Sequence, residues 1–360
     1  MGGINKQATS VPGESGNRAG SCVLPFRMTS GTVAMTNLAD QIESLSHRTA
    51  AGLLSVHERA EFIELVAQRG HMLGCIAELE KVLALAGALW ADQPEDGTSW
   101  LARGRARARF HLFDEALTDL AEAVRRGADA TEAEAERATI LLALGHFEQA
   151  RTIFEERLSQ RADFNSLAAL AVFHSECGNT ALAEPLFDRC RAAYRGVSPI
   201  PLALLDFQRG HMWMREGALA VAQRWFLSAV GLLPLYAPAQ GHLAEVEADL
   251  GQVEAALARL LPLTRTSDDP DYAGTLARIL MRAGRESEAA PWLERAGRGY
   301  AQLVANYPAA FADHAAFFWL EAGDPCRAHE LAKYNFSLRQ TPRAADLVAR
   351  AAKACGAQSK

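Results

Sequence analysis

The middle of the chain contains the stretch Gly145-His146-Phe147-Glu148-Gln149-Ala150-Arg151-Thr152-Ile153-Phe154. Its pattern predicts a helix that ends at Gly145, a tight turn, and a second helix that begins near Phe147. Ala150 is small enough for two helices to cross closely, and Phe154 lies one turn further along the same helical face. The stretch therefore predicts a helix–turn–helix unit with one apolar face.

The same pattern recurs along the chain. Five further copies place a glycine, an alanine and a later apolar residue at equivalent positions, and a weaker copy lacks the glycine: Gly178…Ala183…Phe187, Gly217…Ala222…Phe226, Gly251…Ala256…Leu260, Gly284…Ala289…Leu293, Gly323…Ala328…Ala332 and Phe113…Ala116…Leu120. Successive alanines are separated by 34, 33, 39, 34, 33 and 39 residues. A helix–turn–helix period of about 34 residues resembles the tetratricopeptide repeat, or TPR.

The resemblance implies an all-α fold, a right-handed α-solenoid in which each unit buries its apolar face against the next. We divide the chain into a flexible tail (1–34), N-terminal helices with a divergent first repeat (36–96), seven TPR units (97–342), and a capping helix with a C-terminal tail (343–360). The capping helix is expected to cover the apolar face of the last unit.

Helix boundaries follow from the capping residues and turn glycines. Asn37 is expected to cap a helix over about 38–48, and Gly70 to end a helix over about 56–69. The two intervals of 39 residues place five extra residues each, which we assign to Arg195–Pro201 and Gly297–Tyr307.

Composition limits the classes of partner. The 360 residues carry a net charge of −6, which argues against bulk attraction to nucleic acid or to an anionic membrane surface. No stretch approaches the 18 uninterrupted apolar residues of a membrane-spanning helix. The expected partner is a protein or peptide, and the sequence leaves the oligomeric state open.

Cysteine usage bears on the compartment. The six cysteines form no CxxC pair and no metal-finger spacing; they are Cys22, Cys75, Cys177, Cys190, Cys326 and Cys355. Because a large helical repeat needs no disulfide staples, we expect reduced thiols and a cytoplasmic location. The apolar run at Cys22–Phe26 is too short for the core of a secretory signal.

The resemblance also implies where ligands bind. In TPR proteins, side chains of the first helix of each unit line the concave face. Carried over to this chain, they give a candidate partner-binding groove of Arg105, Arg109, Glu176, His211, Arg215, His242, Glu245, Asp249, Arg278, Arg282 and Phe317.

One row of this groove alternates in charge, apart from Ala143: Arg109, Ala143, Glu176, Arg215, Asp249, Arg282, Glu321. Adjacent helices pack ~8–10 Å apart, which lets an arginine reach the neighbouring carboxylate. The row is either a salt-bridge ladder that sets the pitch of the superhelix, or a zwitterionic strip that matches a partner of mixed charge.

Two local groups stand out within the groove. His242 and Glu245 share one helical face, and His211 should project toward them from the preceding first helix. This trio is a polar partner-binding patch, ordinary solvated surface or, as a minor alternative, a site for a divalent metal. Phe317 and Phe318 are adjacent, so only one of the two rings should face the groove.

Chemistry that needs fixed spacing is missing from the sequence. It contains no Walker P-loop, no GxGxxG, no HExxH and no GxSxG. We therefore predict a scaffold or adaptor that binds a peptide or protein segment and needs no cofactor. The alternatives are a small-molecule-binding regulatory or biosynthetic module, and a metal-dependent helical-repeat enzyme at His211, His242 and Glu245.

Overall fold

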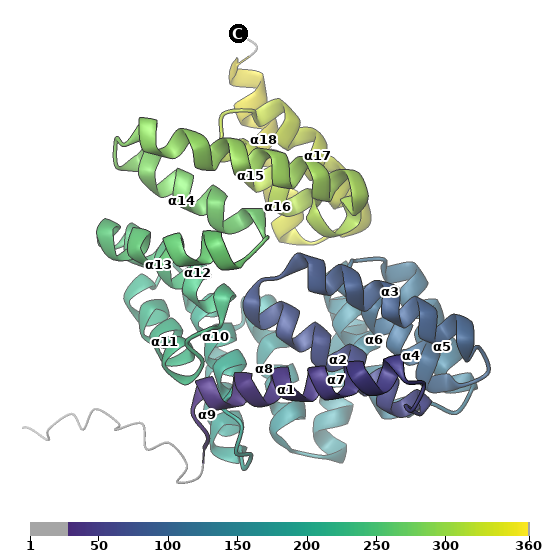
Figure 1. The fold of residues 1–360 in the computed structure, drawn as a ribbon. Helices are drawn as coiled ribbons and strands as arrows, with labels where there is room; N and C mark the ends of the chain where they lie inside the picture. Colours follow the sequence, from purple (N-terminus) through teal and green to yellow (C-terminus); the bar gives the residue numbers. More distant parts are fainter. Residues whose placement is uncertain (1–27, 359–360) are drawn as a thin grey trace, which may run out of the picture.

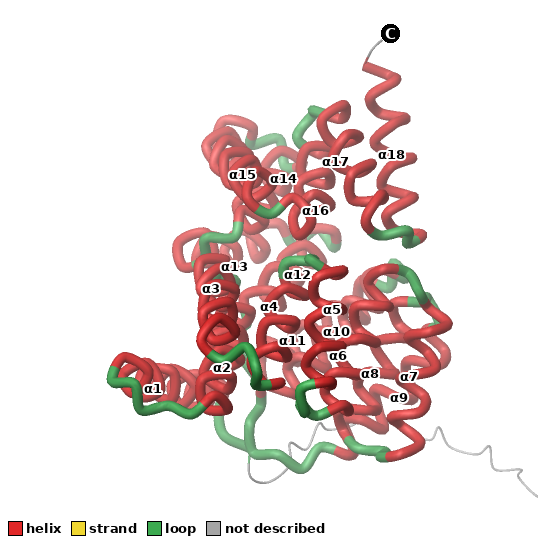
Figure 2. The backbone as a smooth tube through the Cα atoms, turned by 90° about the vertical axis from the view of Figure 1, so that its right-hand side faces the viewer, coloured by secondary structure: helices red, strands yellow, loops and turns green. Residues whose placement is uncertain are grey.

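The computed structural model of the protein describes residues 28–358, and within this range it contains helices and no strand (Figure 1, Figure 2). Most of the predicted N-terminal tail, residues 1–27, lies outside the described part of the chain. The helices are α1 (Gly31–Ala50), α2 (Val56–Leu73), α3 (Ile76–Asp92), α4 (Gly97–Arg109), α5 (Phe113–Arg125), α6 (Ala130–Leu144), α7 (Phe147–Gln160), α8 (Phe164–Glu176), α9 (Thr180–Ala193), α10 (Ile200–Arg215), α11 (Leu219–Leu232), α12 (Ala237–Asp249), α13 (Val253–Thr266), α14 (Pro270–Arg282), α15 (Glu286–Asn306), α16 (Pro308–Glu321), α17 (Pro325–Leu338) and α18 (Pro342–Gln358).

Consecutive helices pack as pairs, from α2 with α3 to α16 with α17, and α18 packs on α17. The predicted helix–turn–helix unit is present at α6 and α7. Gly145 ends α6 at φ 90°, a left-handed conformation that glycine adopts without strain. Ala150 and Phe154 are buried at the helix crossing. The prediction of an all-α solenoid is confirmed.

Two predicted boundaries were wrong. Helix α1 begins at Gly31, because the side chain of Ser30 accepts the N–H of Val33 and caps the helix; Asn37 lies inside it, and residues 31–34 are helical. Helix α2 continues through Gly70 and ends at Gly74, which has φ 61°. Gly70 serves close packing instead, since a Cβ there would lie 3.0 Å from Cβ of Glu78 on α3.

The extra residues of the two long intervals are used differently. The first set lies in the connection between α9 and α10, after Ala193. The second set lengthens α15, which has 21 residues. Both therefore leave the stacking of the first helices intact.

The solenoid turns far enough for its C-terminal part to stack on its N-terminal part, so the green and yellow-green helices lie above the blue ones (Figure 1). Two side-chain contacts join the two parts. Oγ of Ser267 donates to the carbonyl of Gly74, which is 193 positions away in the sequence. Nδ1 of His111 lies 3.1 Å from the carbonyl of Ala309, which is 198 positions away. Asp268 accepts the backbone N–H groups of Ile76 and Ala77 at 2.6 and 2.9 Å.

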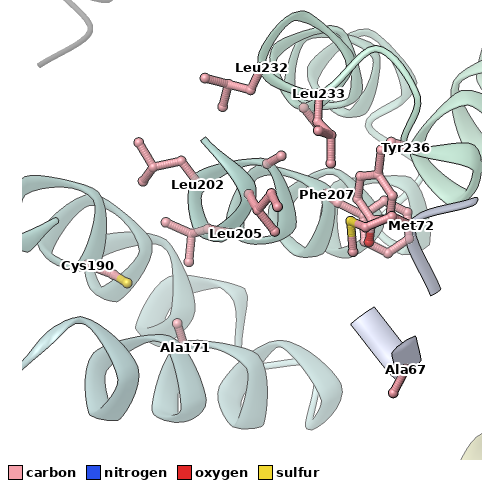
Figure 3. Packing of buried hydrophobic residues seen from close by; sticks show 14 of the residues in the cluster. Ala67, Met72, Ala171, Cys190, Leu202, Leu205, Phe207, Leu232, Leu233 and Tyr236 are labelled. Atoms are coloured by element: carbon pink, nitrogen blue, oxygen red, sulfur yellow. The ribbon is translucent and has the colours of Figure 1, made fainter. Parts of the chain in front are cut away.

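A buried hydrophobic cluster fills the interface of α2 with α10 and α12. Met72, Phe207 and Tyr236 lie side by side in it (Figure 3). Tyr236 has no exposed surface, and its hydroxyl lies 3.3 Å from Nε2 of His71. The first repeat is therefore packed against the middle of the array as well as against its sequence neighbour.

The expectation of reduced thiols was wrong for one pair. Cys326 on α17 and Cys355 on α18 form a disulfide with their Cα atoms 4.7 Å apart. Cys75, Cys177 and Cys190 are free, and Cys22 lies outside the described residues. Spacing in the sequence could not reveal the pair, because the two cysteines meet only when α18 folds back on α17.

Over residues 28–358, no helix combines the length and the apolar character needed to cross a bilayer.

Candidate binding surface on the inner face

Among the described helices, ion pairs on the inner face join most neighbouring even-numbered helices, which are the first helices of their units; α6 with α8 and α10 with α12 are the exceptions. The pairs are Arg109–Glu64 at 2.8 Å, Arg105–Glu132 at 2.8 Å, Arg105–Glu136 at 2.9 Å, Arg215–Glu176 at 2.5 Å, Arg278–Glu245, Arg282–Asp249 at 3.1 Å, Arg282–Glu321 at 3.6 Å and Arg350–Glu321 at 4.0 Å. The structure thus contains the salt-bridge ladder. Each exposed pair contributes only about 0–1 kcal/mol, so the ladder fixes geometry more than stability.

Histidines replace the ion pair between α10 and α12. The rings of His211 and His242 have centroids 5.2 Å apart, and Phe207 lies against both, at 6.2 and 5.5 Å. Burial, together with nearby His242 and Arg215, lowers the pKa of His211 well below its usual value. Burial also opposes protonation of His242, but the hydrogen bond and charge of Glu245 outweigh it and raise the pKa of His242.

The predicted metal trio comes together without forming a ligand set. Nδ1 of His242 lies 2.8 Å from Oε2 of Glu245, and Arg278 bonds the other carboxylate oxygen. Burial favours the neutral acid, yet the hydrogen bonds and charges of His242 and Arg278 hold the pKa of Glu245 well below its usual value. In the described part of the chain, no group of three His, Cys, Asp or Glu side chains is arranged to hold a metal ion.

Phe317 on α16 is the groove-facing member of the Phe317–Phe318 pair, since it is 40% exposed and Phe318 only 7%. The guanidinium carbons of Arg278 and Arg350 lie 6.0 and 5.9 Å from the centre of its ring. Beneath it is a hollow of about 40 Å³, which Arg278, His314 and Glu321 help to line. An exposed aromatic ring between two arginines is a typical anchor for a protein partner.

A larger cavity of about 560 Å³ lies between α2, α4 and α10. Its polar lining consists of Glu64, Gln68, His71 and Arg109. Its apolar lining consists of Leu65, Ala67, Met72, Leu79 and Leu204. This volume is in the range of pockets that hold small organic ligands.

The α2 side of this cavity was not expected from the sequence, because Gly70 was predicted to end the helix. Arg215 and His211 lie two and six residues before Gly217. The same offsets from Gly74 give Met72 and Gln68, which both line the cavity. The correct turn glycine was therefore the signal that could have found these residues.

His71 sits where the cavity meets the interface with α12. His71 keeps an exposed edge, but partial loss of hydration lowers its pKa to about 4, and the positive charge of Arg109 acts in the same direction. The imidazole is therefore neutral at pH 7 and serves as a hydrogen-bonding group.

The paired helices, the turn glycines and the stacked first helices define a protein of the tetratricopeptide-repeat fold. Human IFIT1 with m7Gppp-AAAA is similar at a TM-score of 0.56 and 16% identity, over 89% of this chain and 77% of the other. A tetratricopeptide repeat protein from Parabacteroides merdae matches 75% of this chain and 93% of its own at 14% identity, with a TM-score of 0.44.

The Cut9–Hcn1 structure matches 81% of this chain at 14% identity and a TM-score of 0.48, and the chain spans only 55% of the Cut9–Hcn1 chain that it matches. No protein-family model matches the sequence, and no curated protein matches it either. The similarity thus lies in the fold.

Proposed function

We propose that the protein is a scaffold that binds a peptide or protein segment on the inner face of its C-terminal half, over Phe317. The observation that carries this proposal is the exposed ring of Phe317 beside the guanidinium groups of Arg278 and Arg350, on a face where many of the arginines form ion pairs with carboxylates. Aromatic and arginine side chains dominate the binding free energy of protein interfaces.

Nucleic acid is a poorer candidate partner for this surface. The IFIT1 structures, which are similar in fold, contain PPP-AAAA and m7Gppp-AAAA. In this chain each ladder arginine has a carboxylate beside it, and the net charge is −6. The inner face therefore lacks the excess positive charge that binds phosphates.

Replacing Phe317 by serine is expected to weaken partner binding at least about tenfold, because it removes the aromatic anchor. The measurement is affinity capture from cells of the source organism, quantified by mass spectrometry, for wild type and variant. Arg278→Glu is a poorer choice, because it would place a second carboxylate against Glu245.

Tyr334→Ser is the matched control, since Tyr334 is also 40% exposed but lies on the second helix of its pair, α17. A partner that Phe317→Ser retains, or that both variants lose equally, would contradict the proposed site. Capture of no protein by the wild type would contradict the scaffold function itself.

A second candidate function is a small-molecule-binding module, which the 560 Å³ cavity favours. The third possibility, a metal-dependent enzyme, gains no support, because Arg278 and His242 already occupy the carboxylate of Glu245.

We propose a cytoplasmic location because a large helical repeat needs no disulfide staples; in that compartment the Cys326–Cys355 bond would form only transiently, whereas it would persist in an oxidising one. Thiols can be alkylated in intact cells, and the peptides that contain Cys326 and Cys355 can then be analysed by mass spectrometry. This experiment distinguishes a cytoplasmic from an oxidising compartment. Both cysteines should be alkylated in the cytoplasm. A bonded pair would place the protein in an oxidising compartment.

A further inference from the structure

The cavity between α2, α4 and α10 is built by elements that are distant in the sequence. Glu64 and His71 come from α2, Arg109 from the end of α4, and Leu204 from α10. The contact of α2 with α12 holds this arrangement closed on one side, since His71 reaches the buried hydroxyl of Tyr236. The cavity is thus a consequence of the stacked turns, is open to solvent on its other side, and is separate from the hollow at Phe317.

Its polar groups have unused hydrogen-bonding capacity. Arg109 uses two donors, one to Oε2 of Glu64 at 2.8 Å and one to the carbonyl of Arg105 at 3.2 Å, and a guanidinium has five. Oε1 of Glu64 has no partner among the described residues, but it lies beneath the surface, out of reach of a ligand in the cavity.

Two neutral side chains add further capacity. The side-chain amide of Gln68 bonds no described residue, so its carbonyl oxygen and its NH₂ group are both available. Of the two ring nitrogens of His71, only Nε2 has a partner in the described part of the chain. The cavity therefore offers donors and acceptors together.

Charge and polarity restrict what the cavity can hold. Glu64 and Arg109 neutralise each other, so the polar side carries no net charge. The remaining lining is apolar, with Leu65, Leu79 and Leu204 as its larger side chains. An ion would find no counter-charge there, whereas an uncharged molecule with an apolar body would bury apolar surface against the leucines.

We propose that this cavity binds an uncharged small organic molecule that carries an aromatic amine, an amide or a similar neutral hydrogen-bonding group on an apolar body. The inference deepens the second candidate function by naming its ligand class. It does not depend on the peptide site at Phe317.

Two fluorescent probes with one aromatic framework test the ligand class on the full-length protein. 1-N-phenylnaphthylamine is uncharged and has one N–H donor, and 8-anilinonaphthalene-1-sulfonate adds a negative charge to the same framework. The uncharged probe should bind saturably and at least about tenfold more tightly than the sulfonate. Equal affinities, or no saturable binding of the uncharged probe, would overturn the proposal.

Cavity-filling variants test the location. Leu204→Trp and Gln68→Phe should each weaken binding of the uncharged probe at least about tenfold while the helical circular-dichroism spectrum stays unchanged, and either one suffices if the other does not fold. Leu227→Trp is the control, because Leu227 is exposed on α11. Unchanged binding by the folded cavity variants would overturn the proposal, and Phe317→Ser, which tests the scaffold function, must leave probe binding intact.

Discussion

Replacement of Asp268 by alanine is expected to open the contact between the two turns of the superhelix and to lower the free energy of unfolding by about 1–2 kcal/mol. Asp268 caps α3 from a distance of 192 residues in sequence, because its carboxylate accepts the N–H groups of Ile76 and Ala77. A carboxylate at a helix N-terminus satisfies unpaired donors and opposes the positive end of the helix dipole. Without it, α2 and α3 keep fewer ties to α12 and α14.

Small-angle scattering and hydrogen exchange measure this opening directly. The radius of gyration should increase, and the amides of Ile76 and Ala77 should exchange faster. Asp129→Ala is the matched control, since Asp129 caps α6 by accepting from Thr131 and Glu132 within its own repeat. It should cost similar stability without expansion, so an unexpanded Asp268→Ala protein would mean that other contacts hold the turns together.

Acidification from pH 6.5 to about 4 is expected to weaken the same contact between turns. Partial loss of hydration lowers the pKa of His71 and of His111 to about 4. The pKa of an unfolded histidine is 6.5, so between pH 6.5 and about 4 the unfolded chain binds protons that the folded chain does not. The free energy of unfolding is therefore greatest above pH 6.5 and falls as the pH drops below it. The shifts correspond to at most about 3 kcal/mol per histidine. Screening by solvent at these partly exposed groups reduces this to about 1 kcal/mol each.

The two histidines face different neighbours. His71 lies beside Arg109 and Tyr236, whereas His111 lies between Arg339, which disfavours its protonation, and Asp313, which favours it. Urea unfolding at pH 7 and pH 4.5 measures the loss of stability.

The double variant His71→Gln, His111→Asn should lose about 2 kcal/mol less than wild type over this pH interval. Asparagine is chosen because residue 111 has φ 55°, a left-handed conformation that asparagine tolerates. His47→Gln on the exposed face of α1 is the control and should behave as wild type. Equal pH dependence of the free energy of unfolding in wild type and the double variant would show that protonation of these histidines does not weaken the contact between the turns.

Local patterns predicted the repeat and much of the inner face. Gly145, Ala150 and Phe154 occupy the expected turn and crossing, because their roles depend on backbone conformation and side-chain size within one unit. The alternating row of Arg215, Glu176 and their counterparts pairs as a ladder, because adjacent first helices are joined by a fixed helix–turn–helix geometry. The role of this face in binding a partner remains a prediction.

The sequence by itself therefore determined the all-α repeat, the pairing of its helices, and which side chains occupy equivalent positions on successive first helices. Each of these depends on residues within about one repeat. Only the tertiary structure decided the stacking of the two turns, the cap on α3 by Asp268, the Cys326–Cys355 bond and the cavity beside His71. Apart from the disulfide, which depends on how α18 folds back on α17, these features join residues up to 198 positions apart. Whether such residues meet depends on the small rotation between neighbouring repeats, summed over the array.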